Sequence, residues 1–327
     1  MALALSLIAG VILGVSAHRA GLCTVKAVAE VMTSHRGWYL WSFLKASLWT
    51  AAILALAGLF EGHADLSQRP AALHGVLGGL LFGLGAGANG ACSFSTFARL
   101  AEGHAAMALT ILGWPVGMAA VGLFAPVRDA ATSGHSALPL WAAGFLLLWA
   151  AWEGARIVRR ILAEGLRRTF AEHWTLSLSV AVVAGANAAM LLLGQRWSFT
   201  TTALCASGSD LGAACASQWA LWGVTLAALA GMVGSALLRR SFRLRPIRRA
   251  SAVRHGMAGI VMGAGAALMP GGNDGLILFG LPAVSPHAPA AWGAIVAGIA
   301  LALSITRALG RPLPVIRCDA DICRASL

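Results

Sequence analysis

The sequence predicts an all-α polytopic membrane protein with about nine transmembrane helices and four short re-entrant helices in an inverted repeat. The first observation is composition: 58% of the 327 residues are hydrophobic and only 11% are charged, whereas soluble domains carry about 25% charged residues. The second is a mean hydropathy of +0.77. So few charges cannot cover a surface that faces water, which excludes a soluble enzyme and a disordered protein. The 6 cysteines are too few for a disulfide scaffold.

Long apolar stretches are the third observation, because each has a length that crosses about 30 Å of hydrocarbon. The first begins at residue 2 with no charged segment before it, so we interpret it as a span rather than a cleaved signal peptide. The nine predicted spans lie near 2–17, 40–60, 71–88, 105–125, 138–155, 174–194, 217–238, 255–270 and 289–308.

Four other segments are apolar but too short to cross a bilayer. Each begins beside small or polar residues, and glycine-interrupted segments of this kind are typical of re-entrant helices that line a cavity. The four segments are 21–33, 91–100, 200–206 and 273–281.

The distribution of arginines predicts the orientation in the membrane. Basic residues cluster after the fifth, seventh and ninth spans, and nine crossings place all three clusters on one side, which the positive-inside rule makes the cytoplasm. Only Arg69, Arg128 and Arg196 then lie outside. We therefore expect a bacterial inner-membrane protein with its N-terminus outside and its C-terminus inside. The same rule accounts for the net charge of +12 without a nucleic-acid partner.

The order of long and short segments repeats along the chain. Residues 1–126 hold four spans with a short segment after the first and the third, and residues 174–309 hold the same arrangement. The span at 138–158 connects them, so the two halves begin on opposite sides of the membrane, as in many transporters. Residues 310–327 form a cytoplasmic tail in this interpretation. We expect the tips of the short segments to meet near the midplane of the membrane.

Cys23 and Cys92 lie at corresponding places in the first two short segments. A buried free cysteine is often only a small apolar side chain. At a helix N-terminus, however, the helix dipole favours the thiolate, and unpaired backbone N–H groups bind anions. We predict that both thiols line a substrate path, with core packing as the alternative.

Polar residues at the same turns complete the predicted path. Asn89 and Asn273 can donate amide hydrogens to an anion or cap a short helix. Asp274 is either a functional ionisable group at membrane depth or a cap at the outer surface. The predicted path consists of Cys23, Asn89, Gly90, Cys92, Thr200, Thr201, Gly272, Asn273 and Asp274.

Charged residues near the short segments are expected to form structural pairs. Lys26 and Glu30 are four residues apart and Arg99 and Glu102 are three apart, so each pair shares a helix face. The sequence contains no P-loop and no histidine pair at metal-ligand spacing on a helix. We therefore predict neither ATP-driven pumping nor a metal or other cofactor.

The remaining cysteines form two pairs that are close in sequence. Cys205 and Cys215 lie on the predicted outer side, an oxidising compartment, and their spacing allows a disulfide. Cys318 and Cys323 lie in the predicted cytoplasmic tail, where a C-x4-C pair alone is a poor metal signature. For these two we expect a solvated tail with reducible thiols, or a docking point for a partner.

Residues 82–104, FGLGAGANGACSFSTFARLAEGH, resemble the signature of the YeeE/YedE-type sulfur transport (thiosulfate transporter) family. RAGLCTVKAVAEV, SFTTALCASGSD and MGAGAALMPGGNDGLILFGLP resemble its other short segments, so the likeness covers nearly the whole chain. The resemblance implies an inverted repeat with four half-membrane helices and thiols that pass the substrate along, which map to Cys23 and Cys92. A further family cysteine falls at Gly272, which has no thiol.

These observations predict a transporter, not an enzyme, that imports an inorganic sulfur anion, with thiosulfate as the expected substrate. Its predicted partners are the lipid bilayer and a cytoplasmic sulfur-carrier protein. One alternative is a membrane thiol enzyme or sulfur-relay subunit that passes persulfide sulfur to such a carrier. That alternative needs a base beside a nucleophilic cysteine, and only His18 and His35 flank the first short segment. Another alternative is a channel for a different small ion.

Overall fold

The structure is a computed structural model that describes residues 1–60, 66–124, 132–133, 139–165, 174–208, 215, 217–319 and 321–326. Within these ranges, a short helix follows the first and third long helix of each half, in the order that hydropathy predicts. The long helices are α1 (Ala2–Ala20), α3 (Trp38–Gly58), α4 (Leu73–Asn89), α6 (Met107–Phe124), α7 (Leu140–Glu164), α9 (Leu176–Leu192), α11 (Gln218–Leu238), α12 (Arg249–Leu268) and α14 (His287–Ala308). The short ones are α2 (Thr24–Ser34), α5 (Ser93–Ala101), α10 (Phe199–Ala206) and α13 (Asn273–Gly275), which continues as a π-helical turn over Leu276–Gly280.

The helices make this a multi-pass membrane protein. In the described ranges, 6 helical segments are long and apolar enough to cross a membrane, or up to 7 if α12 and its bent continuation form one span. Two of these segments join a long helix to the short one after it, α1 with α2 and α4 with α5. The count of nine spans stays a prediction, because α9 has only 17 residues and α7 carries charged side chains in its second half.

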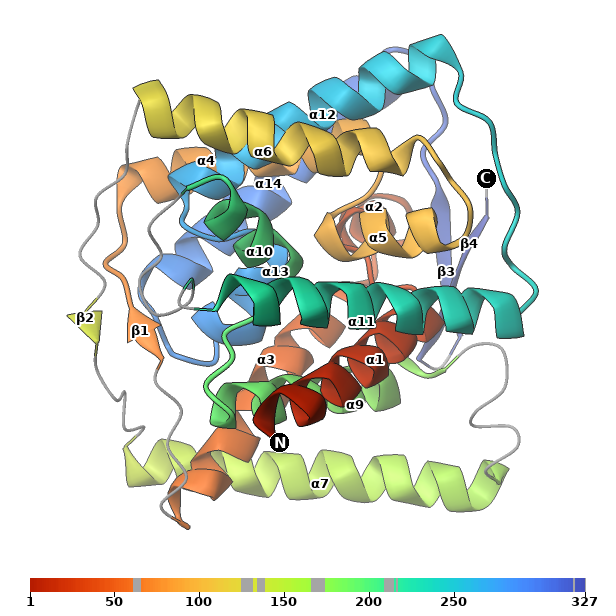
Figure 1. The fold of residues 1–327 in the computed structure, drawn as a ribbon. Helices are drawn as coiled ribbons and strands as arrows, with labels where there is room; N and C mark the ends of the chain where they lie inside the picture. The colour runs from red at the N-terminus through yellow and green to blue at the C-terminus, as the bar shows by residue number, and fades with distance from the viewer. Residues whose placement is uncertain are drawn as a thin grey trace.

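Two layers of long helices enclose the short ones (Figure 1). In one layer α6 packs on α12, α12 on α4 and α4 on α14; in the other α1 packs on α11 and α9, and α9 on α3, with α7 outside α3. Glycines let these helices approach closely, as in other membrane bundles. A Cβ added at Gly117 of α6 would lie 1.9 Å from the Ile260 carbonyl oxygen of α12. Each layer therefore combines two helices from residues 1–126 with two from residues 174–309.

The C-terminal segment differs from the solvated tail that the sequence predicts. It forms an antiparallel hairpin of β3 (Val315–Asp319) and β4 (Ile322–Ser326), which packs against α2. A second small pair, β1 (Ser67–Gln68) with β2 (Thr132–Ser133), lies elsewhere. Hydropathy missed the β3–β4 hairpin because only alternate residues are apolar and buried: Ile316 is fully buried, whereas its neighbours Val315 and Arg317 are exposed.

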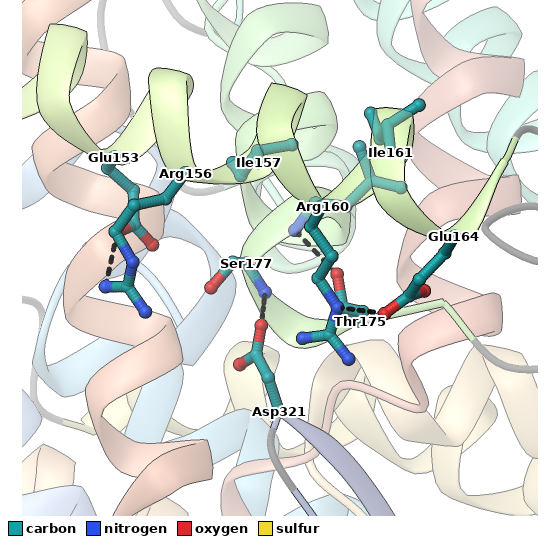
Figure 2. Close-up of a pocket in the computed structure, with 10 residues that line it drawn as sticks. Glu153, Arg156, Ile157, Arg160, Ile161, Glu164, Thr175, Ser177 and Asp321 are labelled. Atoms are coloured by element: carbon teal, nitrogen blue, oxygen red, sulfur yellow. Dashed lines mark hydrogen bonds and ion pairs between the residues drawn. The ribbon is translucent and has the colours of Figure 1, made fainter.

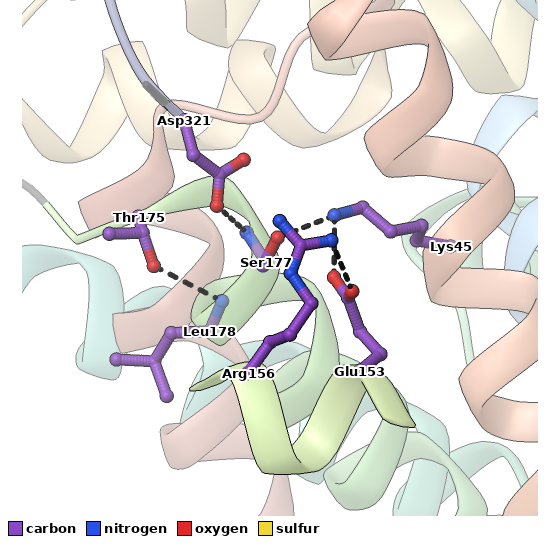
Figure 3. Close-up of polar contacts among 7 residues, drawn as sticks. All are labelled: Lys45, Glu153, Arg156, Thr175, Ser177, Leu178 and Asp321. Carbon is purple, nitrogen blue, oxygen red and sulfur yellow. Dashed lines mark hydrogen bonds and ion pairs between the residues drawn. The ribbon is translucent and has the colours of Figure 1, made fainter. Parts of the chain in front are cut away.

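The turn of the hairpin is fixed to the start of α9. Asp321 accepts a hydrogen bond from the backbone N–H of Leu176 at its carbonyl oxygen (2.8 Å). Its carboxylate accepts another from the N–H of Ser177 (3.0 Å; Figure 3). A carboxylate at a helix N-terminus is stabilised by the unpaired N–H groups and the helix dipole. The chain end is therefore part of the fold and links α2 in the first half to α9 in the second.

Candidate functional site

Cys23 and Cys92 each stand immediately before a short helix. Cys23 precedes α2 and Cys92 precedes α5, and both side chains are fully buried. The turn that leads to Cys92 needs a glycine, because Gly90 ends α4 with a φ of +73°. The local sequence thus ends a long helix, reverses the chain and places a thiol at the N-terminus of the next helix.

The two thiols belong to one hydrogen-bond network. The Ser95 hydroxyl donates to Cys23 Sγ at 3.0 Å, lies 3.5 Å from Cys92 Sγ and accepts the Cys92 backbone N–H at 2.9 Å. The Thr24 backbone N–H donates to Cys92 Sγ at 3.4 Å. Both cysteines are free thiols. The structure therefore brings together two thiols that lie far apart in the sequence, as the matching positions of their segments predict.

Asn89 supports the turn before Cys92. Its amide group donates to the Ala91 carbonyl oxygen and to Thr96 Oγ1, each at 3.1 Å. Its Oδ1 accepts from the Thr110 hydroxyl at 2.8 Å and lies 2.6 Å from His255 Nδ1. Both amide hydrogens of Asn89 are thus used within the protein. Of the two roles that the sequence allows, this geometry fits that of a cap.

The second half supplies a hydroxyl and a carboxylate. Thr200 Oγ1 donates to Asp274 Oδ1 at 2.5 Å and accepts the Gly272 N–H at 3.0 Å, while the Thr200 N–H donates to Asp274 Oδ2 at 3.2 Å. Thr201 bonds instead to Ser198, the residue before α10, through its N–H at 3.0 Å and its hydroxyl at 2.8 Å. Asp274, which is fully buried, is therefore held by the first turn of α10.

Gly272 stands where the family resemblance expects a cysteine. A Cβ added at Gly272 would lie 2.3 Å from Thr200 Cγ2 and 2.6 Å from Thr200 Oγ1, closer than real side chains approach. Thr200 thus fills the space that a side chain at position 272 would take. The absence of the second-half thiol has a packing reason in this chain.

The tips of the two halves meet between the helix layers. Phe97 of α5 stacks on Phe199 of α10 with ring centroids 3.9 Å apart, and Phe94 meets Phe199 edge-on at 6.0 Å. The short helix α13 packs on both α5 and α10. We call this meeting point of α2, α5, α10 and α13 the junction (Figure 1).

Three polar atoms at the junction lack partners. Among the residues that the structure describes, Asn273 Nδ2, Thr24 Oγ1 and Ser93 Oγ have no hydrogen-bond partner, and all three side chains are fully buried. Trp292 Nε1 donates to Asn273 Oδ1 at 3.2 Å, which fixes the amide with its NH₂ group free. A buried polar group without a partner costs about 1–3 kcal/mol. Sequence reasoning missed Thr24, although its place directly after Cys23 at a helix N-terminus was a usable signal.

Ion pairing around the first short segments differs from the sequence prediction. Glu102 lies 3.4 Å from His18 Nε2 rather than pairing with Arg99 in the described structure. Burial raises the pKa of Glu102, but the hydrogen bond and charge of His18 outweigh it and leave that pKa below its ordinary value. Glu30, expected to pair with Lys26, instead accepts the first backbone N–H groups of α3.

A surface pocket between α7, the start of α9 and Asp321 lies apart from the thiols (Figure 2). Its charged side chains neutralise one another: Arg160 pairs with Glu164 at 2.7 Å, and Glu153 pairs with Lys45 at 2.8 Å and with Arg156 at 3.2 Å (Figures 2 and 3). With acids and bases paired, this pocket offers little to a small anion. The junction is the better candidate site.

The paired cysteines form disulfides. Cys205 bonds to Cys215, and Cys318 bonds to Cys323 across the hairpin. In the described ranges, the one group of side chains placed to share a metal ion is Glu30, Cys318 and Cys323, with ligand atoms within 4.8 Å of one another. Metal binding requires thiolates, and a disulfide has none. This group therefore does not make a metal site in the oxidised protein.

Comparison with protein families gives one match. A family model described as sulphur transport matches residues 19–301. The matched range contains all four short helices and both junction cysteines. A comparison with curated proteins finds no match.

Proposed function

The chain belongs to this sulphur transport family, and we propose that its substrate is thiosulfate, imported through the junction. The protein is a membrane transporter of a sulfur compound on the evidence of family and helices. Thiosulfate is a small divalent anion with a soft terminal sulfur. The junction offers donors for its oxygens and thiols for its sulfur.

Two of the unsatisfied atoms at the junction carry the proposal. Asn273 Nδ2 and Thr24 Oγ1 are buried donors without partners in the described residues. Native proteins satisfy nearly all such groups, so each exception calls for an explanation, and an anion held between them supplies one. The N-termini of α2, α5 and α10 add backbone N–H groups and positive dipole ends at the same place.

The thiols have a separate role in this proposal. Cys23 and Cys92 meet at the Ser95 hydroxyl, so one small ion can contact both sulfurs. A thiol is a weak donor and a polarisable contact for another sulfur atom. The two cysteines thus favour a sulfur anion over an oxygen-only anion such as sulfate.

An inverted repeat and the predicted orientation complete the proposal. The packing supports two related halves, 1–126 and 174–309, in which α1, α3, α4 and α6 correspond to α9, α11, α12 and α14. Under this correspondence the contact of α1 with α11 matches that of α9 with α3, and the contact of α6 with α12 matches that of α14 with α4. The arginine distribution supports a cytoplasmic C-terminus in a bacterial inner membrane. An inside-negative potential opposes anion import by about 2.3 kcal/mol per charge per 100 mV. Import therefore needs a coupled cation or rapid consumption inside, for which we propose a cytoplasmic sulfur carrier.

Uptake of labelled thiosulfate into vesicles that hold only this protein tests the proposal. Asn273→Asp keeps the acceptor for Trp292 and the side-chain size but removes the amide donors. Because a hydrogen bond to a charged group is worth about 1.5–3 kcal/mol, and 1.4 kcal/mol is tenfold, the half-saturating concentration should rise at least about tenfold.

Thr24→Val should act in the same direction, with Thr33→Val as the matched control on the same helix. The Thr33 hydroxyl bonds back to the Ala29 carbonyl oxygen, away from the junction. Wild-type protein that moves no thiosulfate would refute the proposed substrate. Unchanged uptake by the Asn273→Asp and Thr24→Val variants would refute the junction as the binding site.

A further inference from the structure

We propose that the C-terminal hairpin is a thiol–disulfide exchange centre in which Cys323 reacts with a cytoplasmic thiol. Glu30 delivers a proton to Cys318 in one direction and removes it in the other. The first observation is where the disulfide lies. Cys318 and Cys323 are joined in a hairpin. Its turn residue Asp321 lines the same pocket as Arg156 and Arg160 of α7. On the orientation proposed above, this face is cytoplasmic. Disulfides in the reducing cytoplasm are usually transient and either catalytic or redox-sensing.

The second observation is a buried carboxylate at one of the two sulfurs. Glu30 Oε1 lies 3.2 Å from Cys318 Sγ, and the Glu30 side chain is fully buried. The carboxylate is held in place by α3, since the Trp38 and Tyr39 N–H groups donate to its two oxygens at 3.2 and 2.9 Å. A disulfide sulfur has no hydrogen to donate, whereas a reduced Cys318 thiol would donate to Glu30. The contact between Glu30 and Cys318 therefore becomes a hydrogen bond only when the disulfide is reduced.

The hairpin can react without unfolding. Its β3 strand is tied to α2 by a hydrogen bond from the Ser34 hydroxyl to the Ile316 carbonyl oxygen (2.5 Å), and its turn is tied to α9 through Asp321. Neither cysteine residue of the hairpin is fully enclosed as a whole. The junction thiols, by contrast, are fully buried and have no disulfide.

The geometry assigns different roles to the two cysteines. A partner thiol loses its proton and its thiolate attacks Cys323 Sγ. The Cys318–Cys323 bond breaks, its electron pair leaves on Cys318 Sγ, and the proton reaches Cys318 through the Glu30 carboxyl group. The products are a mixed disulfide on Cys323 and a Cys318 thiol. A second partner thiol releases Cys323, so that one protein disulfide and two thiols become one protein dithiol and one partner disulfide.

In the reverse direction Glu30 acts as the base for Cys318. The carboxylate takes the thiol proton, and the Cys318 thiolate displaces the partner from Cys323. General acid–base catalysis by a placed side chain typically contributes about 10²–10⁴-fold. The partner class is an aliphatic thiol, either a small one or one carried by a cytoplasmic protein. The inference rests on the proposed orientation but not on transport.

The experiment uses the full-length protein in detergent with mixtures of reduced and oxidised glutathione, quenched with acid and alkylated. Trypsin cleaves after Arg317 and Arg324, so one peptide carries both cysteines and its mass reports disulfide, mixed disulfide or dithiol. We expect this peptide to be reduced by glutathione while the Cys205–Cys215 bond, whose Cys205 is buried, stays intact. A hairpin disulfide that glutathione leaves oxidised would overturn the proposal.

Variants then test the assigned roles. Cys318→Ser should form a lasting mixed disulfide at Cys323, and Cys323→Ser should react at least about tenfold more slowly. Glu30→Gln keeps an acceptor for the α3 N–H groups but cannot take up a proton, and should slow exchange at least about tenfold. Loss of the Cys205–Cys215 bond in the Glu30→Gln protein would show that this variant has not folded. The rates of Cys318→Ser and Cys323→Ser would then test the assigned roles. Equal rates for these two variants, or an unchanged rate for a folded Glu30→Gln protein, would overturn the assignment. Because no step needs vesicles, failure here and failure of thiosulfate uptake are distinguishable.

Discussion

Gly272→Ala is expected to destabilise the protein, because Thr200 occupies the space beside Gly272. The new Cβ would lie 2.3, 2.6 and 2.7 Å from three Thr200 side-chain atoms. Thr200 cannot rotate away freely, since its hydroxyl bonds to both the Asp274 carboxylate and the Gly272 N–H. Overpacking costs about 1–3 kcal/mol, and losing a hydrogen bond to a buried charge costs about 1.5–3 kcal/mol. We expect a total loss of about 2.5–6 kcal/mol in the free energy of unfolding.

A double-mutant cycle in mixed micelles measures this effect. Thr200→Gly removes all three clashing atoms, so Gly272→Ala should cost much less in that background, with a coupling energy of about 1–3 kcal/mol. Gly293→Ala is the matched control, because nothing lies within 4 Å of its added Cβ and its residue is exposed on α14. A Gly272→Ala protein as stable as wild type, or additive effects of the two substitutions, would refute the packing explanation.

Three further predictions concern orientation, the outer disulfide and acid stability. Reporter fusions after residues 165 and 245 should both read cytoplasmic and one near 132 external; opposite readings at 165 and 245 would contradict nine spans. Unreduced protein should show Cys205 bonded to Cys215 by mass, a bond worth about 2–3 kcal/mol, and alkylation of both thiols would contradict it. Burial raises the pKa of Glu102, but the His18 contact lowers it by more, so the net pKa lies below the ordinary value of 4.5. The stability that Glu102 contributes is therefore present at neutral pH and lost as the pH falls below 4.5. Glu102→Gln should flatten that acid limb in thermal unfolding, and an unchanged limb would count against the His18 contact.

Sequence reasoning reached the helices because hydropathy and glycine breaks are local signals. The turns before Cys23 and Cys92 are also local, since in each a glycine with positive φ stands two residues before the thiol. Periodicity also predicts that the two thiols share a neighbourhood, because their segments hold matching places in the repeat.

Contacts between segments that are far apart in the sequence could not be predicted from local patterns. Glu30 was expected to pair with Lys26, four residues away, but the competing N–H groups at the start of α3 take its carboxylate. The hairpin was missed because its alternating pattern is short and its apolar side, Ile316, depends on α2 for burial. The fit of Thr200 against Gly272 joins segments about seventy residues apart, and no single-sequence pattern reports such a contact.

The most direct test of the account is thiosulfate uptake by the Cys23→Ala, Cys92→Ala double variant at equal expression. Both thiols contact Ser95 at the junction, so removing them should abolish uptake if they hold or pass on the sulfur atom. Cys92→Ser, which keeps a donor but replaces a soft sulfur with a hard oxygen, should also abolish it. If the thiols only fill space, their loss should cost on the order of 1 kcal/mol of stability and leave transport intact. Normal uptake by the double variant would contradict the assignment of a sulfur-anion path to this junction.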